Sequence, residues 1–448
     1  MSLIKNANGY ALAFKASDVT TTAMREAIAE WFDLYYRDTP SEKCDPCQRV
    51  PYTIVRKLTK TVFSEYTATT QDKFADKILY ALAIKKASAM QLALIGGECL
   101  LKPVPTGGGF CFVTIPRNNI LVFARDAEGR ITDIGTAEST TAGNYYYTLL
   151  ERRTVNEHGY LTIRNNLFRS MNKDALGQEV PLNNLPQYAE LQPVYTFKEK
   201  IGSVGLVSLR TPMTNCVDGS TDAVSVYAAV VGLIRNLDRM EAQLKGEFDR
   251  GESRIMVSSD LMKKDENGRR TFSDHVFVGL DDDPETVGVT IFSPQLREQS
   301  FLNVKQEILR NIENVIGLKR GLLSEVEAAE RTATEITSSA GEYNLTIIEL
   351  QEAWEKTVRE TVQLCSILGK LYNITDAHEV ADDAVIINWG NGILYDEEKT
   401  WADYKDMVGS GLLKPEIALG WRFNMPAETE NDLNTIRDKF MPSADALM

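Results

Sequence analysis

The sequence predicts an α+β fold of several domains, organised around two long helices at residues 221–248 and 332–372. Three observations predict it. Apolar residues recur every three or four positions in both segments, and the apolar period becomes strand-like after residue 97. The composition, with 43% hydrophobic and 25% charged residues over 448 positions, is that of a folded chain of two to four domains. Few single-domain enzymes need helices of this length, so the pattern favours an assembly built on helices.

The charge balance is acidic, because 63 acidic and 49 basic residues give a formal net charge of −14. Proteins that grip nucleic acid usually carry a basic excess, so this balance argues against tight DNA binding. DNA that passes nearby remains compatible with it, since an acidic wall repels phosphates and keeps them mobile. No apolar run is long enough to span a bilayer, and the N-terminus lacks the pattern of a secretion signal. We therefore expect a cytoplasmic product with no membrane partner.

The N-terminal part of the chain predicts three helices, at residues 23–36, 52–65 and 71–95. Each places its apolar residues on one face at helical spacing. The third is expected to end at Gly96 and Gly97, because glycine adopts the left-handed conformation that closes many helices.

Residues 98–210 predict an antiparallel β region, because short runs rich in β-branched and aromatic residues alternate with turn signals. The triglycine at residues 107–109 could be a phosphate-binding loop, but a strand rather than a helix follows it, so we interpret it as a hairpin turn. Cys99 and Cys111, on either side of this turn, are expected in the core. The expected strands cover residues 98–104, 110–115, 120–124, 131–136, 145–156, 160–166 and 204–209.

The first long helix is predicted from one apolar stripe that extends over about seven turns. The members of the stripe are Val226, Val230, Leu233, Leu237, Met240, Leu244 and Phe248. At 1.5 Å per residue the helix would be about 40 Å long. An apolar stripe of this length is unfavourable in contact with water. We therefore expect the five members from Val230 to Leu244 to pack against neighbouring helices.

Between the two long helices the sequence returns to short strands, at residues 254–257, 275–279 and 287–292, followed by a helix at 295–316. Two groups of basic residues lie in turns of this region. They are Lys263, Lys264, Arg269 and Arg270 around a hairpin turn, and Lys319, Arg320 and Arg331 before the second long helix. Both groups are either solvated loops or loops that meet a polyanion, and the pattern leaves the two interpretations open.

The second long helix begins at a capping box. The Thr332 hydroxyl can accept the amide proton of Glu335, whose carboxylate can reach back to the Thr332 amide. Unbroken, the helix would be about 57 Å long. The elements expected beyond it are a strand at residues 384–389 and helices at 396–408, 414–422 and 428–440.

An acidic turn is the first candidate for catalysis. Clustered carboxylates such as those at residues 281–283 and Glu285 can hold a divalent cation. Adjacent carboxylates on a strand point in opposite directions, however, and Pro284 marks a turn. A solvated turn is therefore the favoured interpretation.

The histidines and cysteines offer no stronger candidate. His158, His275 and His378 have no partner motif, and Cys44 and Cys47 lack the second ligand pair that zinc requires. We expect no catalytic residue, no metal and no cofactor, and hence a protein that is not an enzyme.

Five motifs occur in a fixed order along the chain. They are Trp-Phe-x-Leu-Tyr at residues 31–35, Phe-Ser-Glu at 63–65, Thr-Ala-Thr-Glu at 332–335, Trp-Gly-Asn-Gly-Ile-Leu-Tyr-Asp-Glu-Glu at 389–398 and Gly-Leu-Leu-Lys-Pro-Glu at 411–416. Together they resemble the portal proteins of tailed bacteriophages, especially siphophages of Gram-positive hosts. The order of elements is similar over nearly the whole chain.

The resemblance implies a portal-like subunit in a homo-oligomeric ring, typically a dodecamer, at one capsid vertex of the virion. The ring is assembled in the host cytoplasm, and its channel is the path by which DNA enters and leaves. The implied regions are an α/β wing at residues 1–215 and 373–395, stem helices at 216–249 and 295–316, a small α/β clip at 250–294, a tunnel loop at 317–333, a long helix to the wing at 334–372 and a helical crown at 396–448.

The implied partners are the terminase, head-completion or adaptor proteins, the major capsid protein and scaffold, and DNA in the channel. The resemblance makes the basic residues of the clip, Lys263, Lys264, Arg269 and Arg270, candidates for partner docking. It makes Lys319, Arg320 and Arg331 candidates for DNA contact. Four glutamates between residues 325 and 335 outnumber those three bases, so we expect the contact to be weak and non-specific.

Two alternatives remain at this point. A metal-dependent nuclease or hydrolase would use the acidic turn, with an activity that depends on Mg²⁺. Another capsid or scaffold component would use the long helices as a coiled coil and form dimers or trimers. The stripes lack sustained heptads with flanking charge pairs, which counts against the coiled coil.

Overall fold

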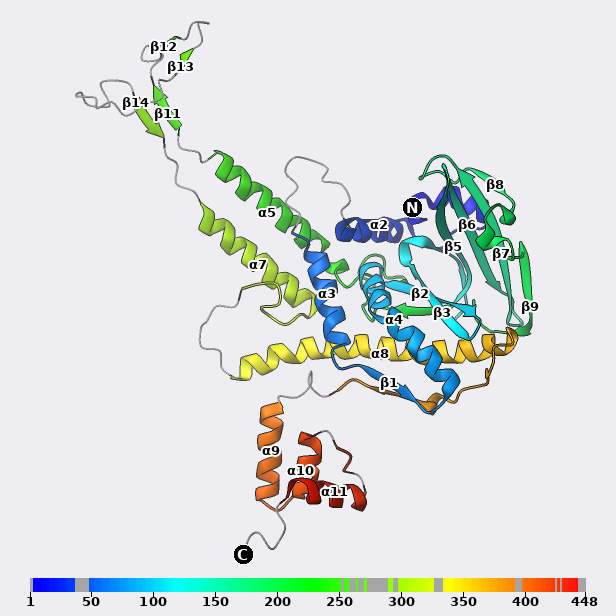
Figure 1. The fold of residues 1–448 in the computed structure, drawn as a ribbon. Coiled ribbons are helices and arrows are strands. Elements are labelled where there is room, and N and C mark those ends of the chain that lie inside the picture. The colour runs from blue at the N-terminus through cyan, green and yellow to red at the C-terminus, as the bar shows by residue number, and fades with distance from the viewer. Residues whose placement is uncertain are drawn as a thin grey trace, which may run out of the picture.

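The structure is a computed structural model of the 448-residue chain. It comprises an α/β body, a helical hairpin that projects from the body, and a three-helix unit near the C-terminus (Figure 1). The residues that it describes are 3–36, 48–250, 254–257, 263–264, 270–271, 289–292, 297–325, 333–390, 397–423, 425–427 and 429–441.

Four helices precede the first sheet. They are α1 (Ala7–Phe14), α2 (Thr22–Tyr36), α3 (Val50–Val62) and α4 (Lys73–Gly96). The last three confirm the predicted helices, whereas α1 was not predicted. The Asp72 carboxylate caps α4 by accepting the amides of Phe74 at 2.9 Å and Ala75 at 2.8 Å. The helix ends at Gly97, whose φ is +84°, and a Cβ there would lie 2.3 Å from the Ala223 carbonyl oxygen, so only glycine fits.

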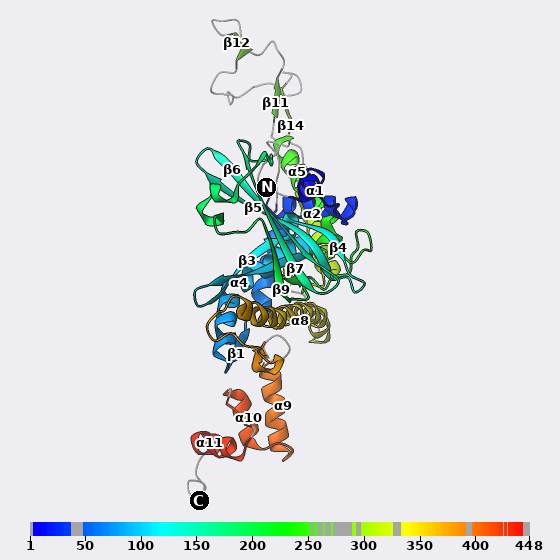
Figure 2. The ribbon, with the colours of Figure 1, turned by 90° about the vertical axis from the view of Figure 1, so that its right-hand side faces the viewer.

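Two antiparallel sheets follow, as predicted, and Figure 2 looks onto the larger one. The smaller sheet has the order β10–β2–β3, formed by Val207–Arg210, Glu98–Thr106 and Gly109–Pro116. The larger has the order β4–β5–β6–β7–β8, with β9 also paired to β7, and its strands are Ile120–Arg125, Ile131–Ala142, Tyr145–Val155, Tyr160–Ser170, Gln178–Val180 and Val194–Lys200. Strands β8 and β9 were not predicted.

The connection between β2 and β3 confirms the hairpin interpretation of the triglycine segment. Thr106 pairs with Gly109, so the two residues between them form the turn. Cys99 is buried as expected, but Cys111 is exposed, so its expected place in the core was wrong. Successive residues of a strand point to opposite faces, and Phe110 and Phe112 occupy the buried face of β3.

Helix α4 is the central helix of the body. It packs against α3, β2 and β3, and its buried residues Ile78, Leu82 and Leu94 belong to the main hydrophobic core. Among the described residues it is the one helix long and apolar enough to cross a membrane by length and composition, which corrects our expectation that no such run exists. Its packing accounts for much of that apolar character, because a helix in a core is apolar on most sides.

The first long helix begins later than predicted. Residues 221–227 are extended or turn, and a short 3-10 helix, Ala228–Val230, leads into α5 (Val231–Arg250). The Val226 amide donates to the Leu94 carbonyl at 3.0 Å instead of to a helical partner. Val226 therefore matches the helical spacing of the stripe although its backbone is not helical.

Helix α7 (Glu298–Ile316) runs back beside α5, and the two form the projecting hairpin (Figure 1). Short strands lie at its far end: β11 (Arg254–Val257), β12 (Lys263–Lys264), β13 (Arg270–Thr271) and β14 (Val289–Phe292). β11 pairs with β14 and β12 with β13, both antiparallel. These confirm two of the three strands predicted here, and the third, at residues 275–279, lies outside the described residues.

Helix α8 (Ala333–Leu371) is the second long helix and crosses the body along one side (Figure 1). Thr332 of the predicted capping box lies outside the described residues. Beyond α8, strand β15 (Val385–Asn388) confirms a predicted strand and pairs with β1 (Thr67–Thr70), which was not predicted.

The C-terminal unit contains the three predicted helices: α9 (Glu397–Gly409), α10 (Pro415–Arg422) and α11 (Glu430–Phe440). A capping box between Thr429 and Asp432 begins α11. Buried Glu416 joins α10 to α11 through Arg437 at 2.6 Å. Further short 3-10 helices lie at Ile4–Asn6, Arg117–Asn119, Leu182–Asn184, Pro186–Tyr188 and Asp382–Ala384.

Candidate functional site

The root of the α5–α7 hairpin, next to the body, has a closed apolar core. Its side chains are all at most 8% exposed: Val230 just before α5, Ile234 and Leu237 in the first turns of α5, and Leu309, Ile312 and Ile316 on α7. Burial of side chains of this size stabilises a fold by about 1.5–3 kcal/mol each. The root is therefore stabilised by contacts within one chain.

The rest of the hairpin is less covered. Of the five residues predicted to pack, Val230 and Leu237 are fully buried, whereas Leu233, Met240 and Leu244 are only half-buried. Ile234, which the predicted stripe omitted, is buried and belongs to the main hydrophobic core. Large apolar side chains that stay 42–52% exposed on the hairpin are Phe248, Leu302, Val304 and Val315.

Ion pairs join the two helices toward the tip of the hairpin. Lys305 Nζ lies 2.9 Å from Glu241 Oε2, and the Arg297 guanidinium donates to both carboxylate oxygens of Glu247 at 3.0 Å. The hydrogen bonds from Arg297 to Glu247 raise the pKa of Arg297 above its ordinary value. Because Arg297 is mostly exposed, water screens the pair, which aligns the helices more than it stabilises them.

The chain that follows α7, residues 317–325, folds back on that helix, and we call it the cap segment. The buried Glu313 carboxylate accepts hydrogen bonds from the amides of Gly321 at 3.2 Å and Ser324 at 2.9 Å. It also accepts the Ser324 hydroxyl at 2.7 Å and the Leu323 amide. Four donors on one carboxylate make a strong clamp, because bonds to a charged acceptor are stronger than neutral ones.

The cap segment carries two of the basic residues expected to meet a polyanion. Lys319 and Arg320 are neighbours and both are exposed, whereas Arg331 lies outside the described residues. Lys57 of α3 donates to the Leu322 carbonyl, which docks the segment on the body. The structure thus presents the two bases on a folded support.

Three of the four basic residues predicted around the far turn lie at the tip of the hairpin. Lys263 and Lys264 form β12, and Arg270 begins β13 opposite Lys264. The predicted hairpin is confirmed, and it brings these positively charged residues together at one end. Arg269 lies outside the described residues.

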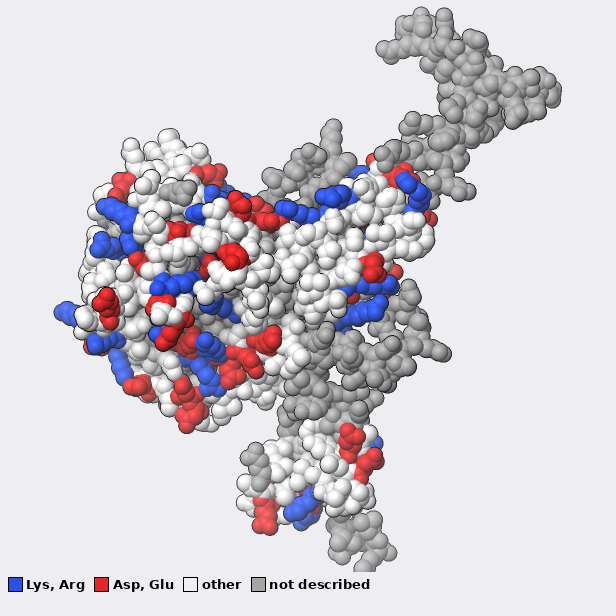
Figure 3. Space-filling view, turned by 180° about the vertical axis from the view of Figure 1, so that it is seen from behind, with Lys and Arg blue, Asp and Glu red and all other residues white. Residues whose placement is uncertain are grey.

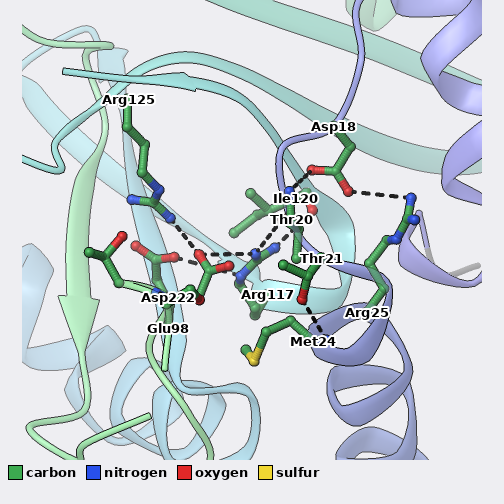
Figure 4. A network of polar contacts seen from close by, with 12 residues as sticks. Asp18, Thr20, Thr21, Met24, Arg25, Glu98, Arg117, Ile120, Arg125 and Asp222 are labelled. Carbon is green, nitrogen blue, oxygen red and sulfur yellow. Dashed lines mark hydrogen bonds and ion pairs between the residues drawn. The ribbon is translucent and has the colours of Figure 1, made fainter. Parts of the chain in front are cut away.

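A buried ion network ties the start of the hairpin to the body (Figure 4). Its centre is Arg117, which is fully buried and lies 3.8 Å from Glu98 and 3.7 Å from Asp222. Arg125 holds the same Asp222 carboxylate at 2.7 Å. Asp222 belongs to the segment that leads into α5, so the network fixes the position from which the hairpin leaves the body.

Neutral partners also bond to this network, although Arg117 Nε and Glu98 Oε2, which lie 3.8 Å apart, make no hydrogen bond. Arg117 donates to the Ile120 carbonyl and to the Thr20 hydroxyl, both at 3.1 Å, and Ser208 donates to Glu98 at 2.5 Å. Hydrogen bonds of this kind offset part of the cost of burying charged groups. Sequence reasoning missed the network because its members come from distant parts of the chain.

The described residues contain no group of three or more His, Cys, Asp or Glu side chains that could hold a metal ion. His158 is exposed, and His378 Nε2 lies 2.6 Å from Asp72 in the cap of α4. Several candidates lie outside the described residues: 281–285, His275, Cys44 and Cys47.

Acidic and basic side chains are interspersed over the face of the molecule seen in Figure 3. A surface that grips nucleic acid usually carries a continuous basic patch. The mixed pattern and the net charge of −14 together indicate weak attraction for a polyanion on this face.

The chain is similar to known proteins both in sequence and in structure. The family model described as "Phage portal protein, SPP1 Gp6-like" matches residues 109–434, which is more than half of the chain. A chain of the solved structure "Neck of native GTA particle computed with C12 symmetry" has a TM-score of 0.48 and 9% sequence identity, with 94% of this chain and 99% of that chain covered. The comparison with curated proteins gives no match.

Proposed function

This chain belongs to the SPP1 Gp6-like family of phage portal proteins, and from that premise we propose that twelve copies form a ring at one capsid vertex. It is a structural component of the virion. Its channel is the path for DNA during packaging and ejection, and terminase supplies the ATP chemistry. The ring also docks head-completion proteins, the major capsid protein and scaffold.

The main support for a ring is that apolar side chains of the α5–α7 hairpin remain exposed in the single chain. Phe248, Leu302 and Val304 leave apolar surface exposed on the ion-paired hairpin. Exposed apolar surface that recurs along a projecting element favours burial against another copy. Side-by-side hairpins would form a channel wall.

Each region receives a role in this proposal. The hairpin is the stem, its strand-bearing tip the clip, α8 the link to the wing, and α9 to α11 the crown. The assigned ranges are wing 1–215 and 373–395, stem 216–249 and 295–316, clip 250–294, tunnel loop 317–333, long helix 334–372 and crown 396–448.

DNA contact is assigned to the cap segment and the residues after it. Lys319 and Arg320 are exposed there, and Arg331 follows in the sequence. Few bases in an acidic chain neutralise few phosphates, so DNA slides past instead of being gripped. The basic residues at the tip, Lys263, Lys264, Arg269 and Arg270, are assigned to docking of an acidic surface of the terminase or of a head-completion protein.

Native mass spectrometry and negative-stain class averages of the purified protein test this function. We expect a closed ring of about twelve copies with a central channel. A monomer or dimer that persists at all concentrations would overturn the proposal. Free DNA should bind the ring weakly, with a shallow dependence of affinity on salt concentration.

A further inference from the structure

Helices α3 and α4 pack against each other, and both carry exposed basic side chains; we call the exposed residues named below the α4 face. Tyr80 and Ile84 are 73% and 66% exposed at its centre. Its bases make no ion pair or side-chain hydrogen bond with any residue that the structure describes, and Asp76 is the acid exposed among them. The members of the α4 face are Arg56 and Lys60 on α3 and Lys73, Lys77, Tyr80, Ala83, Ile84 and Ala87 on α4.

A second exposed surface lies on α8, and we call it the α8 ridge. It consists of Leu345, Glu349 and Glu352, which are spaced four and three residues apart and so share one side of the helix. Leu345 is 61% exposed. Neither glutamate is paired within the described part of the chain. Lys356 follows on the same side and pairs with Glu360 at 3.9 Å.

The two surfaces lie on different helices. The buried side of α8, with Ile347, Leu350 and Trp354 fully covered, packs against α3 and α4. The α8 ridge lies on the opposite side of that helix, and the α4 face lies on the sides of α3 and α4 that are turned from the core. One subunit therefore carries basic side chains on α3 and α4 and acidic side chains on α8 that have no charged partner within the described residues.

We infer that the α4 face of one subunit packs against the α8 ridge of the next. The occupant is a second copy of this chain because the charges are complementary and each surface also offers apolar side chains, Tyr80 and Ile84 against Leu345. Contact between two different surfaces continues from copy to copy and closes into a ring when the rotation permits. This inference rests on the proposed ring and names the side chains that join its subunits.

Charge reversal on each surface tests the inference. The α4-face variant carries Arg56→Glu, Lys60→Glu, Lys73→Glu and Lys77→Glu, and the α8-ridge variant carries Glu349→Lys and Glu352→Lys. Either variant alone places like charges across every interface, so we expect loss of rings and monomers by native mass spectrometry. A mixture of both variants restores opposite charges at every interface, so it should form rings of even subunit number.

The mixture also guards against misfolding, because chains that cannot fold cannot restore a ring. As a control, Lys173→Glu, Lys198→Glu and Lys200→Glu reverse exposed charges elsewhere on the body and should leave rings intact. Rings from either variant alone, or monomers from the mixture, would overturn the interface while the wild-type ring stands. A wild-type protein that forms no ring would instead overturn the proposed function.

Discussion

The body and the α5–α7 hairpin differ in where their charged side chains form ion pairs. In the body, charged side chains such as Arg117 and Glu98 are buried and paired within the chain. In the hairpin, charges pair at the surface, and apolar side chains such as Phe248 and Val304 stay exposed. The difference teaches that the body has a buried, ion-paired interior of its own, whereas the hairpin beyond its root leaves apolar surface that other copies would cover in the proposed ring.

Removal of the central cation should break the body most severely. Arg117→Met leaves the buried carboxylates of Glu98 and Asp222 without their shared partner, which costs about 3–5 kcal/mol of stability. Urea denaturation of the monomer measures the loss. The control Arg130→Met, at a side chain 72% exposed, should leave the unfolding midpoint unchanged. Equal midpoints for the two variants would contradict a self-contained body.

A matched pair of substitutions separates the root of the hairpin from its exposed part. Leu237→Ala opens a cavity in the root and should cost the monomer about 2–5 kcal/mol. Val304→Ala removes a side chain that is 46% exposed, so the monomer should keep its stability while ring formation requires a higher protein concentration. Urea denaturation and native mass spectrometry together check both. If Val304→Ala destabilised the monomer, the exposed part of the hairpin would contribute to monomer stability as the root does, contrary to the prediction.

Lowering the pH should destabilise the body by protonating the buried carboxylate of Glu151. Burial alone would raise the pKa of this carboxyl, but Arg153 at 2.7 Å and Lys102 at 2.6 Å outweigh burial and lower the pKa to about 2. The folded pKa lies below the unfolded one, so the stabilisation is full above about pH 4.5 and is lost as the pH falls toward 2. The loss amounts to about 3 kcal/mol.

Urea midpoints of the wild type and of Glu151→Gln between pH 6 and pH 2 would measure it. The difference between the two proteins should shrink as the pH falls. A difference that stays constant with pH would show that the carboxylate charge contributes nothing.

The smallest effect is expected at the cap segment. Glu313→Gln removes the charge and one acceptor from the clamp, so the amides of Leu323 and Ser324 should exchange about tenfold faster, which corresponds to about 1.4 kcal/mol. Hydrogen–deuterium exchange with mass spectrometry checks this locally. The exposed residue Glu307, changed to Gln, is the control. Unchanged protection of residues 321–324 would mean that the body alone holds the segment.

Periodic patterns predicted most helices and strands here, because both depend on local spacing. Helix α4 illustrates this, since its apolar positions and its Gly97 stop are visible in sequence. The start of α5 was predicted too early because a hydrogen bond from Val226 to Leu94, far away in the chain, replaces a helical one. Tertiary partners of this kind leave no periodic signal.

The residues of the candidate site were predictable only where their placement depends on neighbours in the sequence. The basic residues around Lys264 and Arg270 were expected at a hairpin turn and lie at one. Glu313 was missed because its role depends on the backbone reversal at Gly317, where φ is +74°. Before the reversal is known, nothing indicates that this glutamate faces amides eight to eleven residues later.

Helix α8 has 39 residues and is therefore about 58 Å long. One part lies beside the cap segment, where Thr346 approaches Gly317, and its other end carries Leu371, next to Tyr372, whose ring lies 6.3 Å from that of Phe197 in β9. If α8 is directed outward from the channel of the proposed ring, its length contributes to the radius of the ring. Seven added residues would move the outer end of the helix outward by about 10 Å and keep the orientation of that end, whereas a single added residue would turn its outer part by about 100°. In the proposed ring, the number of whole turns in α8 would therefore set the distance between the cap segment and the outer end of the helix.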